Sequence, residues 1–517
     1  MDNKVLILFL FVIVTCDSAR ILGVFPTASI SHQVVFRPLM AELAKRGHEV
    51  VVITPDPAYP KGETPPNLTE IDVHDISYNL HTPFFKQNAA RITDFKIIGM
   101  GVYRKFAEYF IVQMKSPQVQ ELFNNKNITF DLIFTESCFR PAIAVSHLYK
   151  VPVIDYSTMD GQHGSYEMIG AVTHPLIFPI SVAQRIQNMT LWEKIESLYT
   201  RFYVDYHYSL LEEEENQMLR TVFGEDMPDL SVLKNNVKML FLNVHPLWDL
   251  NRPVPPSVLY LGGSGTHLPP VKELPQDLKT YLDSSKNGVI YVSFGTNNRP
   301  SLLPPEKLKI MTKVFSELPY DILWKWDVLD YPDRPKNVKI GLWFPQSDLL
   351  RHPKVKLFIT QQGLQSTDEA IAAGMPVVGI PMLWDQWYNA EMCQMHKMGI
   401  KVLLETLTEH SLKSAIETIF NNYQSYRDNA VKLRTLLRDQ KESPLERAVW
   451  WTEHVLRTGG DHLRSPIANM SWSEYYQLDL ILFILAILLA ITIVIISVIR
   501  YIISKFNNII KIKIKTK

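Results

Sequence analysis

The chain is poor in cysteine and carries no excess of either charge. Only three of its 517 residues are cysteines, Cys16, Cys138 and Cys393. Cys16 lies in an expected signal segment, so no disulfide framework is indicated. Lysine plus arginine and aspartate plus glutamate number 53 each, which gives a net charge of zero. A nucleic-acid-binding domain needs a basic surface, and we therefore expect no nucleic-acid partner.

Metal-binding patterns are also missing from the sequence. There is no Asp-x-Asp motif, and no group of histidines and cysteines has the spacing of a metal site. A hard cation needs several oxygen ligands, and zinc needs nitrogen or sulfur ligands at characteristic spacings. We therefore expect neither a metal ion nor another cofactor.

Two long hydrophobic runs lie near the ends of the chain. Residues 1–19 contain Lys4, an apolar stretch and small residues near Ala19, which is the pattern of a cleaved secretory signal. An uncleaved membrane anchor is the alternative, although the apolar stretch is short for one. Residues 480–499 are almost wholly apolar and can span ~30 Å of hydrocarbon. We predict a transmembrane helix over 478–499.

The C-terminal tail indicates how the protein is oriented. Residues 500–517 contain six basic and no acidic residues, so the positive-inside rule puts this tail in the cytosol and the bulk of the chain in the lumen. Lys513 and Lys515 resemble a dibasic signal for retrieval to the endoplasmic reticulum, the alternative being a basic stop-transfer flank. We expect a single-pass type I protein of the endoplasmic reticulum membrane. Sequons for a lumenal glycoprotein occur at Asn67, Asn127, Asn188 and Asn469.

The rest of the sequence predicts two α/β halves. Apolar runs at 21–26 and 48–55 flank a helix-like segment, which is the start of a βαβ unit with a parallel sheet. A second series of such units begins at Val289, after a proline-rich stretch over 241–275. We expect two Rossmann-like domains facing a cleft. Their expected boundaries are 20–245 and 276–475, with a linker over 246–275.

Residues 343–386 are the most informative part of the sequence. The apolar run at 355–360 predicts a buried strand, and a turn and a helix follow, with Ser366 or Thr367 as the expected N-cap. A strand, a tight turn and a helix N-terminus together bind phosphate through backbone N–H groups and the helix dipole.

A second strand, at 377–381, leads to Asp385 and Gln386. The loop that carries them lies at the carboxyl end of the strand, where open α/β sheets bind ligands. Strand, turn, helix and acid–amide pair therefore occur in an order that suits a nucleotide sugar.

This block resembles the signature of UDP-glycosyltransferases, specifically the membrane-bound animal type and most nearly its insect members. Upstream, NGVIYVSFGT at 287–296 matches the strand of that family that ends in Ser-x-Gly. The resemblance extends from the signal segment to the basic tail. It implies the GT-B architecture and a UDP-sugar donor, with glucose as the common sugar of insect members.

The resemblance also implies roles for single residues. Trp343 would stack on the uracil, Gln346 would bond its edge, and Glu369 would hold the ribose. Asp385 and Gln386 would bind the sugar hydroxyls. The residues expected near the diphosphate and the uridine are Ser293, Gly295, Gln361, Gly363, Gln365 and Ser366.

Four positions depart from the common family pattern. Many relatives have His where Gln361 stands, Gly where Gln362 stands and Asn where Gln365 stands, and vertebrate members usually have Asp where Glu136 stands. Gln361 can donate a hydrogen bond but never carries a positive charge. A side chain at position 362 would crowd the phosphate or require a conformation that favours glycine. A non-catalytic lipophile-binding or regulatory protein is therefore the alternative to an enzyme.

His32 is the candidate general base. It follows the first predicted strand, at the sheet edge that faces the cleft, and an imidazole can accept a proton from a hydroxyl at neutral pH. The catalytic base of the family has the matching position. Glu136 ends the predicted strand 130–136 and would orient the ring. Asp131 competes for this role, but it begins the same strand and would lie at the opposite edge.

These residues predict direct displacement at the anomeric carbon. His32 would deprotonate an acceptor hydroxyl, which attacks opposite UDP and inverts the configuration. Aromatic residues concentrated over 79–123 would line an apolar pocket, contact the bilayer or simply pack in the core. We expect a small lipophilic acceptor, such as a phenolic, a steroid or a xenobiotic in detoxification, with a membrane lipid as the rival. Association into a homo-oligomer is compatible with the sequence.

Overall fold

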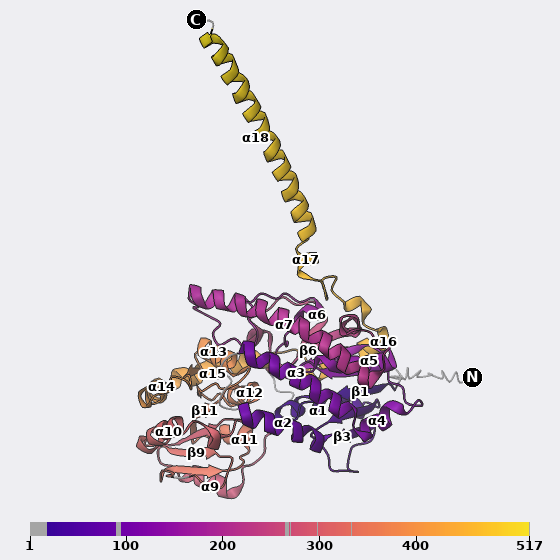
Figure 1. Cartoon of the computed structure of the whole chain (residues 1–517). Coiled ribbons are helices and arrows are strands. Elements are labelled where there is room, and N and C mark those ends of the chain that lie inside the picture. The colour runs from indigo at the N-terminus through magenta and orange to yellow at the C-terminus, as the bar shows by residue number, and fades with distance from the viewer. Residues whose placement is uncertain are drawn as a thin grey trace, which may run out of the picture. The chain divides into compact units, whose positions relative to one another are not determined.

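A computed structural model describes residues 18–88, 95–263, 268, 270–296, 298–331 and 333–515. Almost all of the predicted signal segment lies outside the described residues. The chain divides into two compact units, Met1–Ser465 and Pro466–Lys517. The first unit contains two parallel sheets, and the second contains the long apolar helix (Figure 1).

The first sheet has seven parallel strands in the order β3-β2-β1-β4-β5-β6-β7. Its central strands are continuous apolar runs because both faces of a parallel sheet are covered by helices. The strands are β1 (Arg20–Val24), β2 (Glu49–Thr54), β3 (Leu68–Asp72), β4 (Leu132–Glu136), β5 (Val153–Ser157), β6 (Val237–Leu242) and β7 (Val258–Tyr260).

Helices connect these strands and pack on the sheet. They are α1 (Ile30–Lys45), α2 (His74–Asn88), α3 (Phe95–Met114), α4 (Pro117–Asn124), α5 (Val145–Tyr149), α6 (Ser165–Ile169), α7 (Leu191–Phe223) and α8 (Leu230–Leu233). Helix α7 is the longest of this unit, with 33 residues. It begins with a capping box in which Thr190 and Glu193 satisfy each other's backbone N–H groups.

The second sheet has six parallel strands in the order β10-β9-β8-β11-β12-β13. The strands are β8 (Val289–Ser293), β9 (Asp321–Lys325), β10 (Val338–Gly341), β11 (Val355–Thr360), β12 (Val377–Gly379) and β13 (Gly399–Lys401). The helices are α9 (Gln276–Ser284), α10 (Pro305–Glu317), α11 (Gln346–Leu350), α12 (Leu364–Ala373), α13 (Gln386–Met395), α14 (Glu409–Asn421) and α15 (Tyr423–Arg438).

The chain then returns to the first sheet. Helix α16 (Pro444–Thr458) packs against α1, and Val449 and Val455 lie in one apolar cluster with Val35 and Leu39 of α1. Figure 1 shows α16 among the helices of the first half. The expected boundaries of the two domains stay a prediction, and the structure adds that residues after α15 help to cover the first sheet.

The order of the strands indicates at which edge of each sheet a ligand would bind. In the first sheet, the strands that follow β1 are added on one side of it up to β3, and β4 then begins the other side. In the second sheet, β9 and β10 lie on one side of β8, and β11 begins the other side. The order of the strands therefore reverses between β1 and β4 and between β8 and β11. A crevice forms at the carboxyl ends of the strands at such a switch point, and open α/β sheets bind their ligands there. His32, Glu136, Gly295 and Gln361 all follow or end these four strands.

The second unit consists of α17 (Trp472–Tyr475) and α18 (Leu478–Lys515). Residues Leu478–Ile509 are long and apolar enough to cross a membrane. The helix continues past residue 499 through most of the basic tail. Because length and composition are weak support for a membrane span, the anchor and its orientation stay predictions.

Candidate active site

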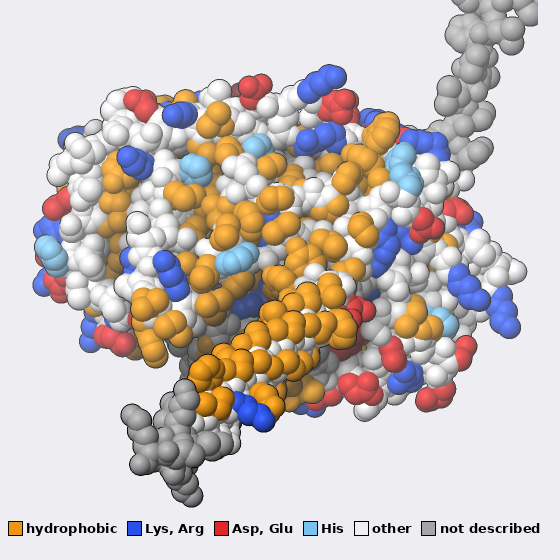
Figure 2. Space-filling model, turned by 90° about the horizontal axis from the view of Figure 1, so that it is seen from above, with side chains coloured by type: hydrophobic (Ala, Val, Ile, Leu, Met, Phe, Trp, Pro, Cys, Tyr) orange, Lys and Arg blue, Asp and Glu red, His pale blue; other side chains and the backbone are white. Residues whose placement is uncertain are grey.

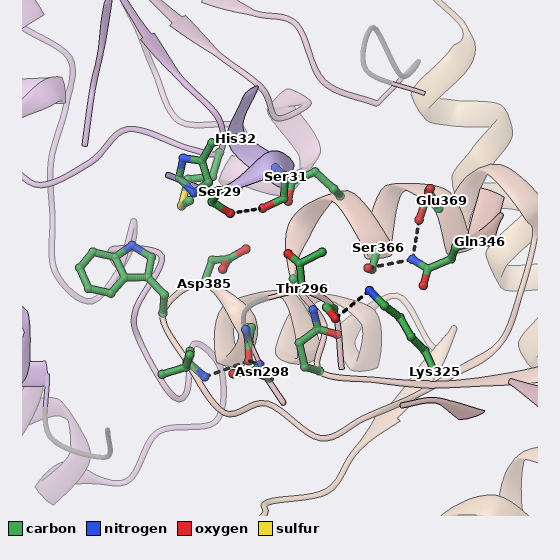
Figure 3. A pocket seen from close by; sticks show the side chains of 18 of the residues that line it. Ser29, Ser31, His32, Thr296, Asn298, Lys325, Gln346, Ser366, Glu369 and Asp385 are labelled. Atoms are coloured by element: carbon green, nitrogen blue, oxygen red, sulfur yellow. Dashed lines mark hydrogen bonds between the residues drawn. The ribbon is translucent and has the colours of Figure 1, made fainter. Parts of the chain in front are cut away.

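A cavity of about 470 Å³ lies between the carboxyl edges of the two sheets. Its walls come from both halves of the first unit, and Figure 3 shows polar side chains of both halves directed into it. A volume of this size is typical of a small-molecule site. The sequence-predicted residues that line it are His32, Gly295, Trp343, Gln346, Gln361, Gly363, Gln365, Ser366, Glu369, Asp385 and Gln386.

His32 and Glu136 form a hydrogen-bonded pair at the wall of the first half. His32 lies in the first turn of α1, and its Nδ1 atom is 2.7 Å from Oε1 of Glu136, the last residue of β4. The Glu136 side chain is fully buried, whereas that of His32 is 16% exposed. Strands β1 and β4 are neighbours in the sheet, so their carboxyl ends bring the two residues together. Nε2 is then the ring nitrogen without this carboxylate partner.

Thr27 fixes the carboxylate of Glu136. The Thr27 hydroxyl donates to Oε1 over 2.6 Å, and its backbone N–H donates to Oε2 over 3.1 Å. Asp131, the competing carboxylate of the sequence analysis, accepts a hydrogen bond from the backbone N–H of Arg20 at the opposite edge. It therefore lies far along the strand from His32.

Cys138 lies beside His32 and Glu136, and the three side chains together are a candidate metal site. Ligand atoms of His32, Glu136 and Cys138 lie within 4.8 Å of one another. However, both oxygens of Glu136 already accept hydrogen bonds, and burial raises the pKa of the Cys138 thiol well above its usual value. A protonated thiol is a poor metal ligand, so these residues suit the orientation of an imidazole better than the binding of a cation.

The turn after β8 meets the turn after β11. Gly295 has a φ of +78°, and a Cβ atom there would lie 2.2 Å from Nε2 of Gln361. The backbone conformation therefore favours glycine, and any side chain at this position would also displace the Gln361 amide. Ser293 is buried behind this wall, and its hydroxyl accepts the backbone N–H of Gly295 over 3.4 Å. Ser293 thus supports the turn, and any effect on a ligand in the cavity is indirect.

Helix α12 begins earlier than the sequence predicts. Its N-cap is Gly363 and its first residue is Leu364, so the expected N-cap at Ser366 or Thr367 was wrong. The reason is a distant partner, since the backbone N–H of Leu364 donates to Oδ2 of Asp385 over 3.0 Å. The first-turn N–H groups of a helix lack intrahelical acceptors. Here that turn, with Gln365 and Ser366, lines the cavity.

Gln346 links three polar groups on the wall of the second half. Its Nε2 donates to Ser366 Oγ over 3.0 Å and to Glu369 Oε2 over 2.5 Å, as Figure 3 shows. Its Oε1 accepts from the hydroxyl of Tyr291 over 3.0 Å. Burial raises the pKa of Glu369 to about 7, so this carboxyl group changes its charge near neutral pH.

Trp343 presents an aromatic face to the cavity. Its side chain is 66% exposed, and the Lys325 ammonium lies 4.3 Å from the ring centroid. Lys325 also donates to the carbonyl oxygen of Gly295 over 3.0 Å. Burial lowers the pKa of Lys325 to about 8. An exposed indole backed by a cation is a suitable surface for a planar ring.

Hydrogen bonds within the protein already occupy one side-chain oxygen of Asp385 and the side-chain oxygen of Gln386. Asp385 Oδ2 accepts from Leu364 and, over 2.7 Å, from Asn389. Burial raises the Asp385 pKa to about 6. Gln386 Oε1 accepts the backbone N–H groups of Met382 and Leu383, both over 2.9 Å. The carbonyl of Gln386 therefore holds the loop, and its amide NH₂ is the part suited to a ligand hydroxyl.

Gln365 connects the two halves beside the candidate base. Its Nε2 donates to the carbonyl oxygen of Thr158 over 3.3 Å, and the Thr158 hydroxyl lies 3.2 Å from Nδ1 of His32. The helix that carries the predicted phosphate-binding turn is thus joined through one residue to the imidazole.

Gln362 does not crowd the cavity. Its φ is +68°, the left-handed conformation that favours glycine. Its side chain is fully buried and accepts hydrogen bonds from Thr367 Oγ1 over 3.0 Å and Cys393 Sγ over 3.2 Å. The backbone strain is therefore real, but the glutamine side chain is directed into the protein and away from the predicted phosphate site.

Four residues at or beside the cavity escaped the sequence analysis. Lys325 ends β9, so its place at the carboxyl end of a parallel strand was a usable signal. His81, Asn298 and Thr158 come from a helix and two loops, where no periodic pattern marks a side chain as functional. His81 lines the cavity, and burial lowers its pKa to about 4, so its ring is neutral near pH 7.

Comparisons with known proteins identify the family of the chain. Residues 20–515 match the family described as UDP-glucoronosyl and UDP-glucosyl transferase. An ecdysteroid UDP-glucosyltransferase of Spodoptera littoralis nuclear polyhedrosis virus is 35% identical over 93% of this chain and 97% of its own. UDP-glucosyltransferase 2 of Dactylopius coccus is 31% identical over 94% of each chain.

Solved structures show the same fold. A UDP-glucose: anthocyanidin 3-O-glucosyltransferase in complex with UDP superimposes with a TM-score of 0.58 at 17% identity, over 85% of this chain and 99% of that one. The calicheamicin glycosyltransferase CalG4 gives a TM-score of 0.56 at 16% identity, over 86% and 99%. The two facing Rossmann-like sheets are therefore the predicted GT-B fold. Because the family match runs nearly from end to end, the chain belongs to the UDP-glucoronosyl and UDP-glucosyl transferase family and is a glycosyltransferase.

Proposed function

We propose that this glycosyltransferase transfers glucose from UDP-glucose to a hydroxyl of a small lipophilic acceptor, with inversion at the anomeric carbon. The observation that carries the proposal is the His32–Glu136 pair on one wall of a cavity whose other wall holds the predicted donor residues. A base on one side and a nucleotide-binding edge on the other are the arrangement that a single displacement needs.

The reaction follows from the free ring nitrogen of His32. With Nδ1–H donated to Glu136, the lone pair on Nε2 takes the proton of the acceptor hydroxyl. The acceptor oxygen bonds to C1 of the glucose while the bond from C1 to the UDP oxygen breaks. Glu136 stabilises the imidazolium that forms. The departing negative charge is stabilised by first-turn N–H groups of α12.

The donor roles rest on the geometry of the second half. Uracil would stack on Trp343, beside the amide of Gln346, and the ribose hydroxyls would donate to Glu369. The glucose hydroxyls would bind Asp385 and the NH₂ group of Gln386. Glucose is favoured as the sugar because the curated relatives are named UDP-glucosyltransferases.

The acceptor would lie against the first half. Apolar side chains of Val102, Phe106 and Met159 line this part of the cavity, together with the neutral ring of His81. Such a wall suits an aromatic or alicyclic molecule with a hydroxyl directed at His32. Since several relatives are named ecdysteroid UDP-glucosyltransferases, a polyhydroxylated steroid is the first acceptor to test, followed by phenolics.

We also propose that α18 anchors the enzyme in the endoplasmic reticulum membrane with its first unit in the lumen. The apolar stretch of 32 residues supports the anchor, and the signal segment and basic tail support the orientation.

The test is product formation by the full chain in membranes. UDP-glucose and UDP-glucuronic acid would each be offered with steroid and phenolic acceptors, with and without EDTA. Glucoside formation from UDP-glucose that is independent of EDTA is the expected result. Product from UDP-glucuronic acid alone would show that glucose is not the transferred sugar. Loss of activity with EDTA would contradict a mechanism without a metal ion. UDP-glucose binding without product from any acceptor would favour a non-catalytic binder.

A further inference from the structure

Helix α7 has an apolar face that no other described part of the first unit covers. Between residues 191 and 210 eight large hydrophobic side chains are exposed, as are the charged Lys194 and Glu196, and Leu191, Trp192 and Phe202 are each more than 70% exposed. We call this face the α7 stripe. Its members are Leu191, Trp192, Ile195, Leu198, Tyr199, Phe202, Tyr206 and Leu210.

The stripe is continuous at helical spacing. Its members recur every three or four residues, so they lie along one side of the helix over about 30 Å. Figure 2 is seen from above the view of Figure 1, from the side on which α7 lies, and hydrophobic side chains are exposed on that side of the first unit. Val204 and Leu211, on the opposite side of α7, are buried in the protein. An apolar surface this long on a soluble unit marks an interaction site.

Several charged side chains of this part of α7 are paired within the protein. Glu193 is held by its capping box and by Arg185. Arg201, with a side chain that is 12% exposed, pairs with Glu167 of α6 and with Asp205 one turn on. Lys194 and Glu196 are exposed beside the stripe and carry opposite charges. Because the stripe itself holds no charged side chain, it suits a lipid phase better than a charged partner.

We propose that the α7 stripe lies in the interfacial region of a lipid bilayer and docks the first unit on the membrane surface. Trp, Tyr, Phe and Leu are the side chains that settle at the boundary between headgroups and acyl chains. The bilayer is also within reach, because only residues 466–477 separate the first unit from α18. Twelve residues span at most about 40 Å. This step rests on the proposed membrane anchor, although the test below does not.

A second copy of the chain fits the stripe less well. The stripe is a single protruding helix face about 30 Å long and about 10 Å wide, whereas the core of a dimer interface needs a complementary surface on the second copy. A membrane has no such requirement, since it can cover a single protruding helix and gain the burial of each side chain in turn.

The test uses the full chain in phosphatidylcholine nanodiscs, one copy per disc, with a photoreactive phospholipid. We expect cross-links to peptides of 191–210 as well as to α18. The double variant L198E/F202E should lower α7 cross-linking by about tenfold, since carboxylates resist burial in the interface, and should leave α18 labelling unchanged. L329E is the matched control, because Leu329 is 85% exposed and lies outside the stripe.

Each outcome decides the proposal. Labelling of α7 supports docking of the stripe on the membrane. If α7 is labelled and α18 is not, the docking proposal stands and only the proposed role of α18 as a membrane anchor is wrong. Labelling of α18 without α7 overturns the docking proposal, as does labelling of neither. If 191–210 is protected from hydrogen exchange only in discs that hold two copies, the stripe is a dimer interface and the proposal is wrong. The readout is independent of glucosyl transfer, so it stands apart from the proposed reaction.

Discussion

The Nδ1 atom of His32 lies 2.7 Å from Oε1 of Glu136, although 104 positions separate the two residues in the chain. The contact arises because β1 and β4 are adjacent parallel strands whose carboxyl ends meet. It fixes which ring nitrogen faces the carboxylate and leaves Nε2 as the atom proposed to act as the base.

Replacing His32 by alanine should abolish glucosyl transfer and spare donor binding. A positioned base contributes about 10²- to 10⁴-fold to rate, and the residues predicted to bind the donor lie on the other half. We expect kcat to fall by at least about 10²-fold, with an unchanged rise in melting temperature on adding UDP-glucose. H410A, at an exposed residue of α14, is the matched control. Turnover near the native rate in H32A would contradict the mechanism.

Glu136→Gln tests the orientation of the imidazole. Glutamine keeps the size of the side chain but cannot stabilise the imidazolium, so kcat should fall by about 10- to 10³-fold. The Kd for UDP-glucose should change little, because the predicted donor residues lie on the other half. Asp131→Asn changes the same type of group at the opposite edge and should leave kcat unaltered. A native kcat in E136Q would reduce Glu136 to a packing residue.

Gly295→Ala should impair both stability and donor binding. The φ of +78° strains any side chain, and the new Cβ would meet Gln361 Nε2 at 2.2 Å. We expect a loss of about 1–2 kcal/mol in the free energy of unfolding and a higher Kd for UDP-glucose. In the double variant G295A/Q361A the contact between the new Cβ and Gln361 is removed, but the strain of the backbone at position 295 remains. Gly101→Ala, where nothing lies within 4 Å of the new Cβ, is the control and should not weaken donor binding.

The affinity for UDP-glucose should rise as pH increases through about 7. Glu369 has a raised pKa of about 7 because it is buried, and only its carboxylate form can accept both ribose hydroxyls. The donor-bound enzyme therefore holds fewer protons than the free enzyme, so binding strengthens towards higher pH, by about tenfold between pH 6 and 8. Titration calorimetry at several pH values measures this.

Glu369→Gln separates this effect from that of Asp385, whose pKa is about 6. The variant should bind UDP-glucose more weakly at pH 8 and lose most of the pH dependence above pH 6.5. If E369Q retains the native slope over that range, a different group controls donor binding.

Several features of the fold could be read from the sequence because they are local. Apolar runs of strand length gave β1, β2, β8 and β11, since a buried parallel strand has no polar alternation to obscure it. The cavity-lining positions of Trp343, Gln346, Glu369 and Asp385 were implied by the resemblance of residues 343–386 to a family signature, and the structure brings all four to one cavity.

Other features were decided by contacts between distant segments. The start of α12 at Leu364 depends on Asp385, a cap supplied from another loop. Gln362 accepts a left-handed backbone because Thr367 and Cys393 hold its side chain inside the protein. Neither partner can be identified from spacing along the chain.

The sequence by itself determined that two parallel α/β halves, a nucleotide-binding block and a long apolar helix occur in this order. These properties depend on hydrophobic periodicity and turn chemistry within a few residues. The tertiary structure alone decided that Lys325 lies beside Trp343, that α16 returns to α1, and that α7 keeps an apolar face outward. Such relationships depend on how whole elements pack, and packing depends on contacts between residues far apart in the chain.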